Sequence, residues 1–434
     1  MSTQPLSINN DSSPQNVVTN NLTAARGTFK ELVTLGLGVK ELDAITGVFD
    51  TVVTTDLTTT NLTTTNLTVA SGKINLTDVG CNIGIGANAL SNITTGTEDI
   101  AIGCDALYSN TTGSKNLAIG HKALYSNTTS DYNVAIGYLA LQQNTAPYNI
   151  AVGFDTLMSN TTGVNNVGFG LGSLTSNTTG SDNQAMGVNS LFSNTTGNYN
   201  LAIGSNILKN SNADFNIGIG YNALVSNTSG AYNMAVGQNA LFSNTIGKNN
   251  VAIGVNSLSF NGGGDDNVGV GAASLYQNIG SKNVAVGSGT LGAKSVCSAN
   301  VAVGFAALNV NAGDSNVAIG SSALVINTTG KNNVAIGYSA MITNTTGSNN
   351  VAIGSAVVAT GTGNVVIGYN STDNGVADTI VLGSGVKGQA KALVLGSGVV
   401  PATDGSNSFG GMYLPVYCGN PGVLYRLALY ADSP

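Results

Sequence analysis

The stretch Asn333-Val334-Ala335-Ile336-Gly337 decides the fold, because the same five-residue word recurs through most of the chain. It stands unchanged at 133–137, 250–254, 316–320 and 350–354. The glycines that close this word and its variants are 16 or 17 residues apart, at positions 86, 103, 120, 137, 153, 170, 187, 204, 220, 237, 254, 271, 287, 304, 320, 337 and 354. Looser copies close at 368, 383 and 396. Such a period indicates a solenoid in which each repeat forms one coil.

Apolar residues occupy two fixed positions in the repeat, counted from the closing glycine as position 0. Positions −3 and −1 hold Val, Ile or Leu almost throughout, as in Val334 and Ile336. Two residues separated by one lie on the same face of a strand, and β-branched residues favour strands. We therefore expect the Val and Ile of each word to point away from water, into the core.

Small residues and a leucine complete the expected coil. Position −2 is nearly always Ala or Gly, which predicts cover on the second strand face, from the return strand of the same coil or from a neighbouring chain. Position +4 is Leu in fifteen coils from Leu90 to Leu324, which predicts a second short strand. Asn-Thr-Thr-Gly follows, as at 110–113, and predicts a solvent-facing turn where the coil length varies.

An asparagine column runs through the repeats. Position −4 is Asn in every copy from Asn82 to Asn364, except for Asp99. Identical Asn side chains in register predict a hydrogen-bonded ladder, and the alternative is that Asn suits the turn entering the strand. Together the columns predict an all-β fold, a parallel β-solenoid or β-roll of 16–17-residue coils. About 17 such coils would give a rod roughly 80 Å long.

Composition excludes several classes of protein. Charged residues make up only 8% of the chain, and its 14 basic residues form no basic patch, so we expect no nucleic-acid partner. Met1 to Gln15 contains no apolar signal segment, and no run of 18 apolar residues occurs, so we expect neither signal-peptide secretion nor membrane insertion. The cysteines fit no metal-binding spacing and are predicted to be free thiols: Cys81, Cys104, Cys297 and Cys418.

The sequence predicts four domains. Residues 1–50 form an N-terminal leader or anchor, 51–80 a Thr-rich shaft, 81–398 the β-solenoid, and 399–434 a C-terminal β-hairpin that serves as a cap or a tip. The shaft carries Leu57, Leu62 and Leu67, one Leu per five residues. Such a segment cannot build a core within one chain, so we expect several chains side by side.

The repeated words, each followed by a small residue and Leu, resemble the head repeats of trimeric (YadA-like) autotransporter adhesins over about residues 81–398. Those heads are left-handed parallel β-rolls assembled as trimers, with repeats nearer 14 residues. The longer copies, the Thr-rich shaft and the short aromatic C-terminus are more similar to fibre proteins of phages and large DNA viruses. The resemblance implies a homotrimer on a virion surface, assembled in the host cytoplasm.

Candidate chemical groups are few, and we expect no catalytic, cofactor-binding or metal-binding residues. The sole histidine, His121, has no Cys or carboxylate partner in the local sequence. Asp265-Asp266 is similar to calcium-binding β-roll loops but occurs once, which favours a variant corner. Asn110 and Asn127 match the N-glycosylation pattern, although the turn already explains them.

Aromatic residues recur beside the predicted second strand. They could stack on sugars of a host surface or pack as plugs between coils, and we favour packing; they are Tyr108, Tyr125, Phe192, Phe242 and Tyr276.

The sequence therefore predicts a non-enzymatic structural fibre or spike that attaches a virion or similar particle to a surface. Its partners would be two further copies of itself, a capsid or particle protein through the N-terminal region, and a host surface glycan or protein. Many weak contacts would give strong adhesion. The alternatives are a cell-surface trimeric adhesin with an extracellular location, and an ice- or glycan-binding β-solenoid that uses its Thr columns. An enzyme acting on polysaccharides would require clustered carboxylates.

Overall fold

The computed structural model describes residues 80–293 and 296–387, together with the backbone of short strands at 32–33, 52–53, 393–395, 413–417 and 424–428. The chain divides into two compact units, Met1–Asn75 and Leu76–Pro434. In the first unit, β1 (Leu32–Val33) pairs in parallel with β2 (Val52–Val53). The remainder of the predicted leader, and of the predicted shaft up to residue 79, lies outside the described residues.

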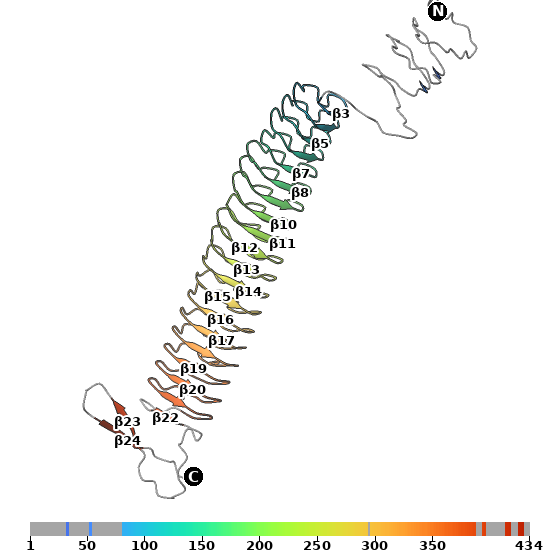
Figure 1. The fold of residues 1–434 in the computed structure, drawn as a ribbon. Coiled ribbons are helices and arrows are strands. Elements are labelled where there is room, and N and C mark those ends of the chain that lie inside the picture. Colours follow the sequence, from blue (N-terminus) through green and yellow to red (C-terminus); the bar gives the residue numbers. More distant parts are fainter. Residues whose placement is uncertain are drawn as a thin grey trace, which may run out of the picture. The chain divides into compact units, whose positions relative to one another are not determined.

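A single parallel sheet of twenty strands forms the solenoid of the second unit. Each strand between β3 and β22 pairs with the strand one coil before and the strand one coil after (Figure 1). The strands are β3 (Ile83–Ile85), β4 (Ile100–Ile102), β5 (Leu117–Ile119), β6 (Val134–Ile136), β7 (Ile150–Val152), β8 (Val167–Phe169), β9 (Gln184–Met186), β10 (Leu201–Ser205), β11 (Ile217–Tyr221), β12 (Met234–Val236), β13 (Val251–Ile253), β14 (Val268–Val270), β15 (Val284–Val286), β16 (Val301–Val303), β17 (Val317–Ile319), β18 (Val334–Ile336), β19 (Val351–Ile353), β20 (Val365–Ile367), β21 (Ile380–Leu382) and β22 (Leu393–Leu395). The predicted fold class, an all-β parallel solenoid with one coil per repeat, is confirmed.

The repeated words lie directly on top of one another. In β18 and β19, Val334 pairs with Val351 and Ile336 with Ile353. The register survives the shorter 16-residue step, since Ile136 of β6 pairs with Val152 of β7. The corners therefore absorb the length difference while the strands keep their alignment, as the sequence predicted.

We expected both faces of the strands to be covered, but only the face of position −2 lies inward in the chain. Ala335 is completely buried, whereas Val334 and Ile336 on either side of it are only half-buried. Our prediction that the Val and Ile of each word point into the core was wrong. The coil is narrow, and its interior accommodates the small residue at position −2 together with one leucine.

The cover over position −2 comes from the same coil. A Cβ atom added to Gly168 would lie 3.5 Å from Cδ1 of Leu157, which precedes it in the same turn of the solenoid. The leucines of position +4 are almost completely buried and join the position −2 alanines in one hydrophobic cluster. Of our two alternatives for this cover, the structure supports the return segment rather than a neighbouring chain.

That return segment is a turn, and the predicted second strand is wrong. Positions +2 and +4 have positive φ, 54° at Asn239 and 50° at Leu241, whereas a parallel strand needs φ near −120°. Left-handed residues bend the chain back within a few residues. The conformation costs about 1–2 kcal/mol per residue, and burying a leucine side chain offsets it with about 1.5–3 kcal/mol.

The asparagines of position −4 form the predicted ladder. The backbone N–H of Asn183 and its Nδ2 both donate to Oδ1 of Asn166 one coil earlier, at 3.1 and 3.2 Å. Nδ2 of Asn183 also donates to the carbonyl of Gly197, at 2.8 Å. This inner ladder, as we call it, satisfies polar groups that would otherwise be buried without partners.

The asparagines of Asn-Thr-Thr-Gly form a second ladder that we did not predict. Nδ2 of Asn177 donates to Oδ1 of Asn160 at 2.7 Å and to the carbonyl of Gly180 at 2.9 Å. These asparagines are buried, so the corner is not solvent-facing at this position as we had expected. Asn110 and Asn127 are completely buried in the same column, which makes their side-chain nitrogens inaccessible to glycosylation in the folded coil.

The predicted C-terminal hairpin pairs as expected. β23 (Tyr413–Tyr417) and β24 (Leu424–Ala428) are antiparallel, with Tyr413 opposite Ala428 and Tyr417 opposite Leu424. The rest of 399–434, including Cys418, lies outside the described residues, and the role of this segment as cap or tip stays a prediction. In the part of the chain that the structure describes, no helix has the length and apolarity to cross a membrane.

Candidate interaction face

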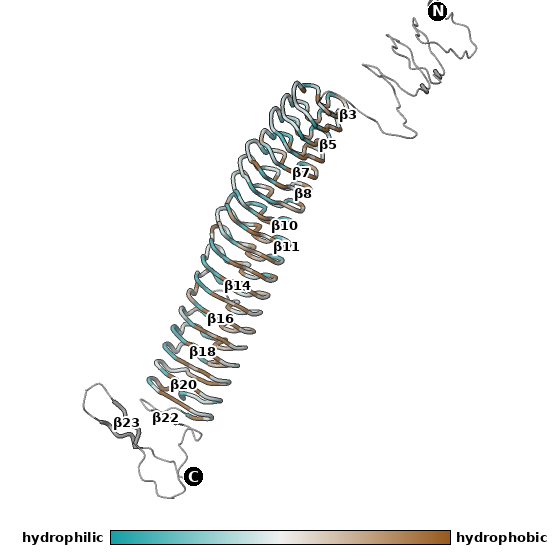
Figure 2. The backbone as a smooth tube through the Cα atoms, in the orientation of Figure 1, coloured by the Kyte–Doolittle hydropathy of each residue, from teal (hydrophilic) through white to brown (hydrophobic). Residues whose placement is uncertain are grey.

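The outward strand face is a partly exposed, mostly apolar surface that repeats along the solenoid. It consists of positions −3, −1 and +1 of the coils that close between Gly86 and Gly368, and we call it the apolar face. At position −1, Ile253 and Ile319 remain 38% and 40% exposed. At position +1 the exposed side chains are mostly larger: Tyr138, Phe154, Leu171, Val188, Tyr221, Val255, Phe305, Tyr338 and Tyr369. Hydrophobic residues follow the strands along the solenoid (Figure 2).

Aromatic rings stack along this face from coil to coil. Tyr138 stacks on Phe154 with ring centroids 5.0 Å apart, and His121 stacks on Tyr138 at 5.4 Å. These distances match the spacing between neighbouring strands, so the sheet itself imposes the stacking. Because the rings cover one another's faces, mainly their edges remain available to a partner.

A second aromatic column flanks the face on the other side of the strands, at position −5. Tyr199 stacks on Phe215 at 4.8 Å, and Phe215 stacks on Tyr232 at 5.0 Å. Tyr132 and Tyr148 form a separate pair at 5.3 Å. The half-buried Val and Ile columns therefore lie between position +1 and position −5, each of which is aromatic in part of the coils.

The aromatic residues singled out from the sequence lie elsewhere, on the return segment. Tyr108 and Tyr125 stack in parallel with centroids 5.2 Å apart, which agrees with packing between coils. Phe192, Phe242 and Tyr276 are half-buried. That these residues stack on sugars of a host surface stays the alternative prediction.

Asp265 and Asp266 have the hydrogen bonds of a corner. Oδ1 of Asp265 accepts from the backbone N–H of Lys248 at 2.8 Å, and Oδ1 of Asp266 accepts from Nδ2 of Asn249 at 3.1 Å. The equivalent carboxylate of Asp131 accepts from the backbone of Ser114 at 2.7 Å in the same way. The structure thus agrees with the interpretation of a variant corner.

Asp99 replaces Asn in the inner ladder and is completely buried. Its Oδ1 accepts from the backbone N–H of Asn116 at 2.8 Å and from Nδ2 of the same residue at 3.1 Å, and its Oδ2 accepts from Nδ2 of Asn110 at 2.9 Å. Burial raises the pKa of Asp99 to about 6, against the opposing effect of these hydrogen bonds.

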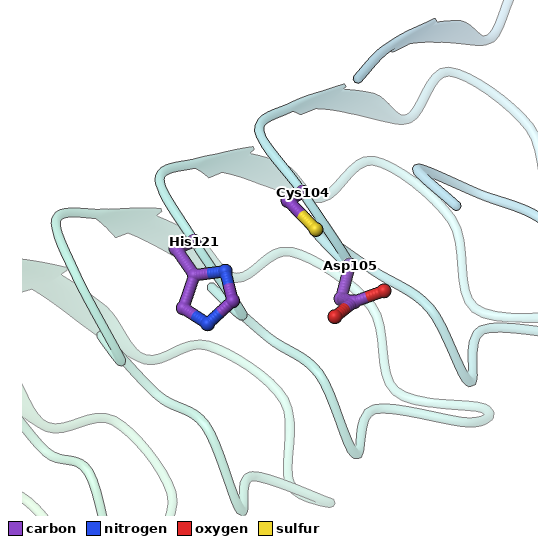
Figure 3. A group of neighbouring side chains, drawn as sticks. All are labelled: Cys104, Asp105 and His121. Atoms are coloured by element: carbon purple, nitrogen blue, oxygen red, sulfur yellow. The ribbon is translucent and has the colours of Figure 1, made fainter. Parts of the chain in front are cut away.

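His121 is not isolated, and our expectation that it lacks a Cys or carboxylate partner was wrong. The ligand atoms of Cys104, Asp105 and His121 all lie within 4.8 Å of one another (Figure 3). Cys104 and His121 are 17 residues apart and occupy position +1 of successive coils. Comparing columns rather than local motifs would have found the pair.

The other predicted thiols have different environments. Cys81 is exposed and forms no disulfide. Cys297 is buried, and its sulfur accepts a hydrogen bond from Nδ2 of Asn278 at 3.1 Å.

Comparison with known proteins assigns this chain to no family. No protein-family model matches it, and no curated protein matches it in sequence.

Proposed function

We propose that this chain is the structural subunit of a homotrimeric attachment fibre, in which the apolar face of each copy is covered by the other two copies. The observation that carries the proposal is the extent of that face. Columns made mostly of Val and Ile, and mostly half-exposed, run from Ile83 and Ile85 in β3 to Val365 and Ile367 in β20, with a polar interruption at Gln184 of β9. A contiguous apolar surface of this extent on a protein surface marks an interaction site.

The periodicity of the face indicates which partner would cover it. The side chains repeat once per strand spacing, about 4.8 Å, over the length of the sheet. A partner must carry apolar groups at the same spacing to remain in register with it, and a second copy of this chain meets that requirement along its full length. Closed rings of identical chains are common among oligomers, and the number three comes from the resemblance to trimeric adhesin heads and viral fibres.

Attachment is the role that such a fibre would serve. Each coil contacts only its neighbours, so a stack of coils gives reach without a large globular core. We propose that the N-terminal region binds a capsid or other particle protein, and that the fibre contacts a glycan or protein of a host surface. The fibre would lie on a virion surface, with the surface of a cell as the alternative location. That the chain performs no catalysis stays a prediction.

The Thr columns favour this role over binding an ice or glycan lattice. The Oγ1 of Thr161 donates to the carbonyl of Thr178 at 2.9 Å, and Thr178 donates in the same way to Thr195. Hydroxyls of this column therefore serve the contact between coils. Thermal hysteresis of the purified chain in a freezing assay would reverse this preference.

Sedimentation equilibrium of the full-length chain tests the proposal. The expected species at micromolar concentration has three times the mass of the chain. A folded monomer under those conditions would exclude the trimer. Mass spectrometry of purified particles from the source of the chain tests the location, and absence of the chain from all of them would exclude the virion role.

A further inference from the structure

We infer that Cys104, Asp105 and His121 form a binding site for a divalent transition-metal ion of the Zn²⁺ class, which links the second and third coils of the solenoid. The inference uses the geometry of one chain, in which Cys104 and His121 occupy position +1, at the border of the face that the proposed trimer would cover. The three side chains supply a thiolate, a carboxylate and an imidazole (Figure 3). This set of donors suits Zn²⁺ and Co²⁺, whereas Ca²⁺ and Mg²⁺ take oxygen ligands.

The distances are compatible with one ion. The three ligand atoms lie within 4.8 Å of one another. In a tetrahedral zinc site, with bonds of about 2.0–2.3 Å, neighbouring ligand atoms are separated by about 3.5 Å. The donors must therefore approach by roughly 1 Å, which rotation of exposed or half-exposed side chains provides. Three protein ligands leave the fourth position open to water.

The backbone beneath the three donors is fixed by hydrogen bonds between coils. The N–H of Lys122 donates to the carbonyl of Cys104 at 3.0 Å, and the N–H of Asp105 donates to the carbonyl of Ala87 at 2.8 Å. The N–H of Gly120, just before His121, donates to Ile102 at 2.7 Å. The ion would bind a preformed backbone, so only side chains need to be ordered.

Neighbouring side chains orient the donors in the way that outer ligand partners do. Nδ2 of Asn88 donates to Oδ1 of Asp105 at 2.8 Å, which leaves Oδ2 for an ion. The ring of His121 stacks on Tyr138 with centroids 5.4 Å apart.

The composition of the chain makes the grouping notable. The chain contains one histidine and four cysteines, and two of these five residues occupy the same column in adjacent coils. Elsewhere position +1 mostly holds aromatic, aliphatic or serine side chains. The site lies in the coils of β4 and β5, close to the first coil that the structure describes. An ion shared by these two coils would resist their separation.

Cobalt binding to the full-length chain tests the inference directly. The chain is stripped with a chelator, kept reduced with a phosphine and titrated with Co²⁺, while thiolate charge-transfer and tetrahedral ligand-field absorption are followed. The expected result is one Co²⁺ per chain, displaced by Zn²⁺. Absence of thiolate charge transfer, or one ion per three chains, would overturn a site built from a single chain.

Substitutions test which side chains bind the ion. Cys104→Ser and His121→Tyr should each weaken binding at least about tenfold, and Asn88→Ala by about tenfold. Tyr is the native residue at the same column in Tyr138, so His121→Tyr keeps the ring stack. The matched control is Cys81→Ser, at an exposed thiol outside the group, which should bind as the unchanged chain does. Unchanged binding by His121→Tyr would refute the assignment.

Hydrogen exchange gives a second readout, independent of absorption. Bound Zn²⁺ should slow exchange at the amides of Gly120 and Lys122, whose hydrogen bonds join the two linked coils. Exchange at Gly304, in a distant coil, should remain the same. If Zn²⁺ changes the exchange rate at none of the three amides, the ion does not link the coils.

Discussion

The backbone N–H and the side-chain Nδ2 of Asn250 both donate to Oδ1 of Asn233, one coil earlier, at 3.0 and 3.1 Å. One amide oxygen thus closes two hydrogen bonds, and Nδ2 of Asn250 adds a third to the carbonyl of Gly264 at 2.8 Å. The same arrangement repeats along the inner ladder. It ties the entry of each strand to the coil before it and to the corner of the coil after it.

Removing one member of the ladder should therefore destabilise the coils on both sides. We expect Asn250→Ala to lower the free energy of unfolding by about 2–3 kcal/mol, because the buried Oδ1 of Asn233 loses its side-chain donor and the carbonyl of Gly264 loses a partner. Denaturant unfolding measures the change. Asn210→Ala removes an exposed hydrogen bond to Val225 and should change stability by less than about 0.5 kcal/mol. Equal effects of the two substitutions would contradict a structural role for the ladder.

The closing glycine of each word tolerates no side chain. Gly237 has φ +132°, and an added Cβ atom would lie 2.6 Å from the carbonyl oxygen of Gly254 in the next coil. We expect Gly237→Ala to cost about 3 kcal/mol or more, from strain combined with overlap. Gly263→Ala is the control, because its Cβ would meet only the side chain of Ile246, at 3.1 Å. Thermal unfolding of both variants makes the comparison, and a stable Gly237→Ala chain would show that the coils can separate at little cost.

Asp99 should make the stability of the N-terminal coils depend on pH. Because burial raises its pKa from 3.8 to about 6, the folded chain retains a proton that the unfolded chain releases between these values. The stabilising contribution is therefore complete below about pH 4 and is lost as the pH rises through about 6. Hydrogen exchange at the amide of Asn116, which donates to Asp99, follows this as a function of pH.

Asp99→Asn should abolish that dependence and restore the ladder. We expect the variant to be more stable at pH 8 by about 1 kcal/mol, since an amide remains neutral when buried. Asp182→Asn alters net charge equally at a half-buried corner in a distant coil and should leave the pH dependence of exchange at Asn116 in place. A variant at Asp99 that keeps the original pH profile would assign the effect to another group.

Charges on the apolar face should separate the proposed trimer. We expect a chain carrying Ile253→Glu, Ile319→Glu and Ile353→Glu to sediment as a folded monomer, because a covered face would bury three uncompensated carboxylates per chain. The control carries the same three charges at exposed corner positions, Thr112→Glu, Thr329→Glu and Thr346→Glu, and should remain a trimer. If both chains keep the same mass, the face is not the contact surface.

The sequence predicted the stacking well because register depends on columns of identical residues. Gly237 and Gly254 share a backbone conformation that other residues rarely adopt, and Asn233 and Asn250 bond directly to each other. Such residues can occupy only equivalent places in successive coils. The period of the sequence and the period of the structure are therefore the same.

Which face of each strand points into the core could not be predicted in the same way. Alternation in Val251-Ala252-Ile253 tells which residues share a face, but not which face is inward. Size suggested the wrong answer, because the core holds Ala252 against leucines and leaves Ile253 outside. The left-handed conformation of Leu241 was equally hidden, since leucine rarely adopts positive φ.

Because the register between coils is fixed, the number of coils can change without changing the structure of each coil. Deleting the 17 residues from Leu171 to Gly187 would join Gly170 to Val188, and every remaining strand would again meet a strand of the same kind. The solenoid would become shorter by about 4.8 Å and would otherwise be unchanged. Duplication or loss of whole repeats therefore changes the length of the solenoid in fixed steps, while every remaining coil keeps its structure.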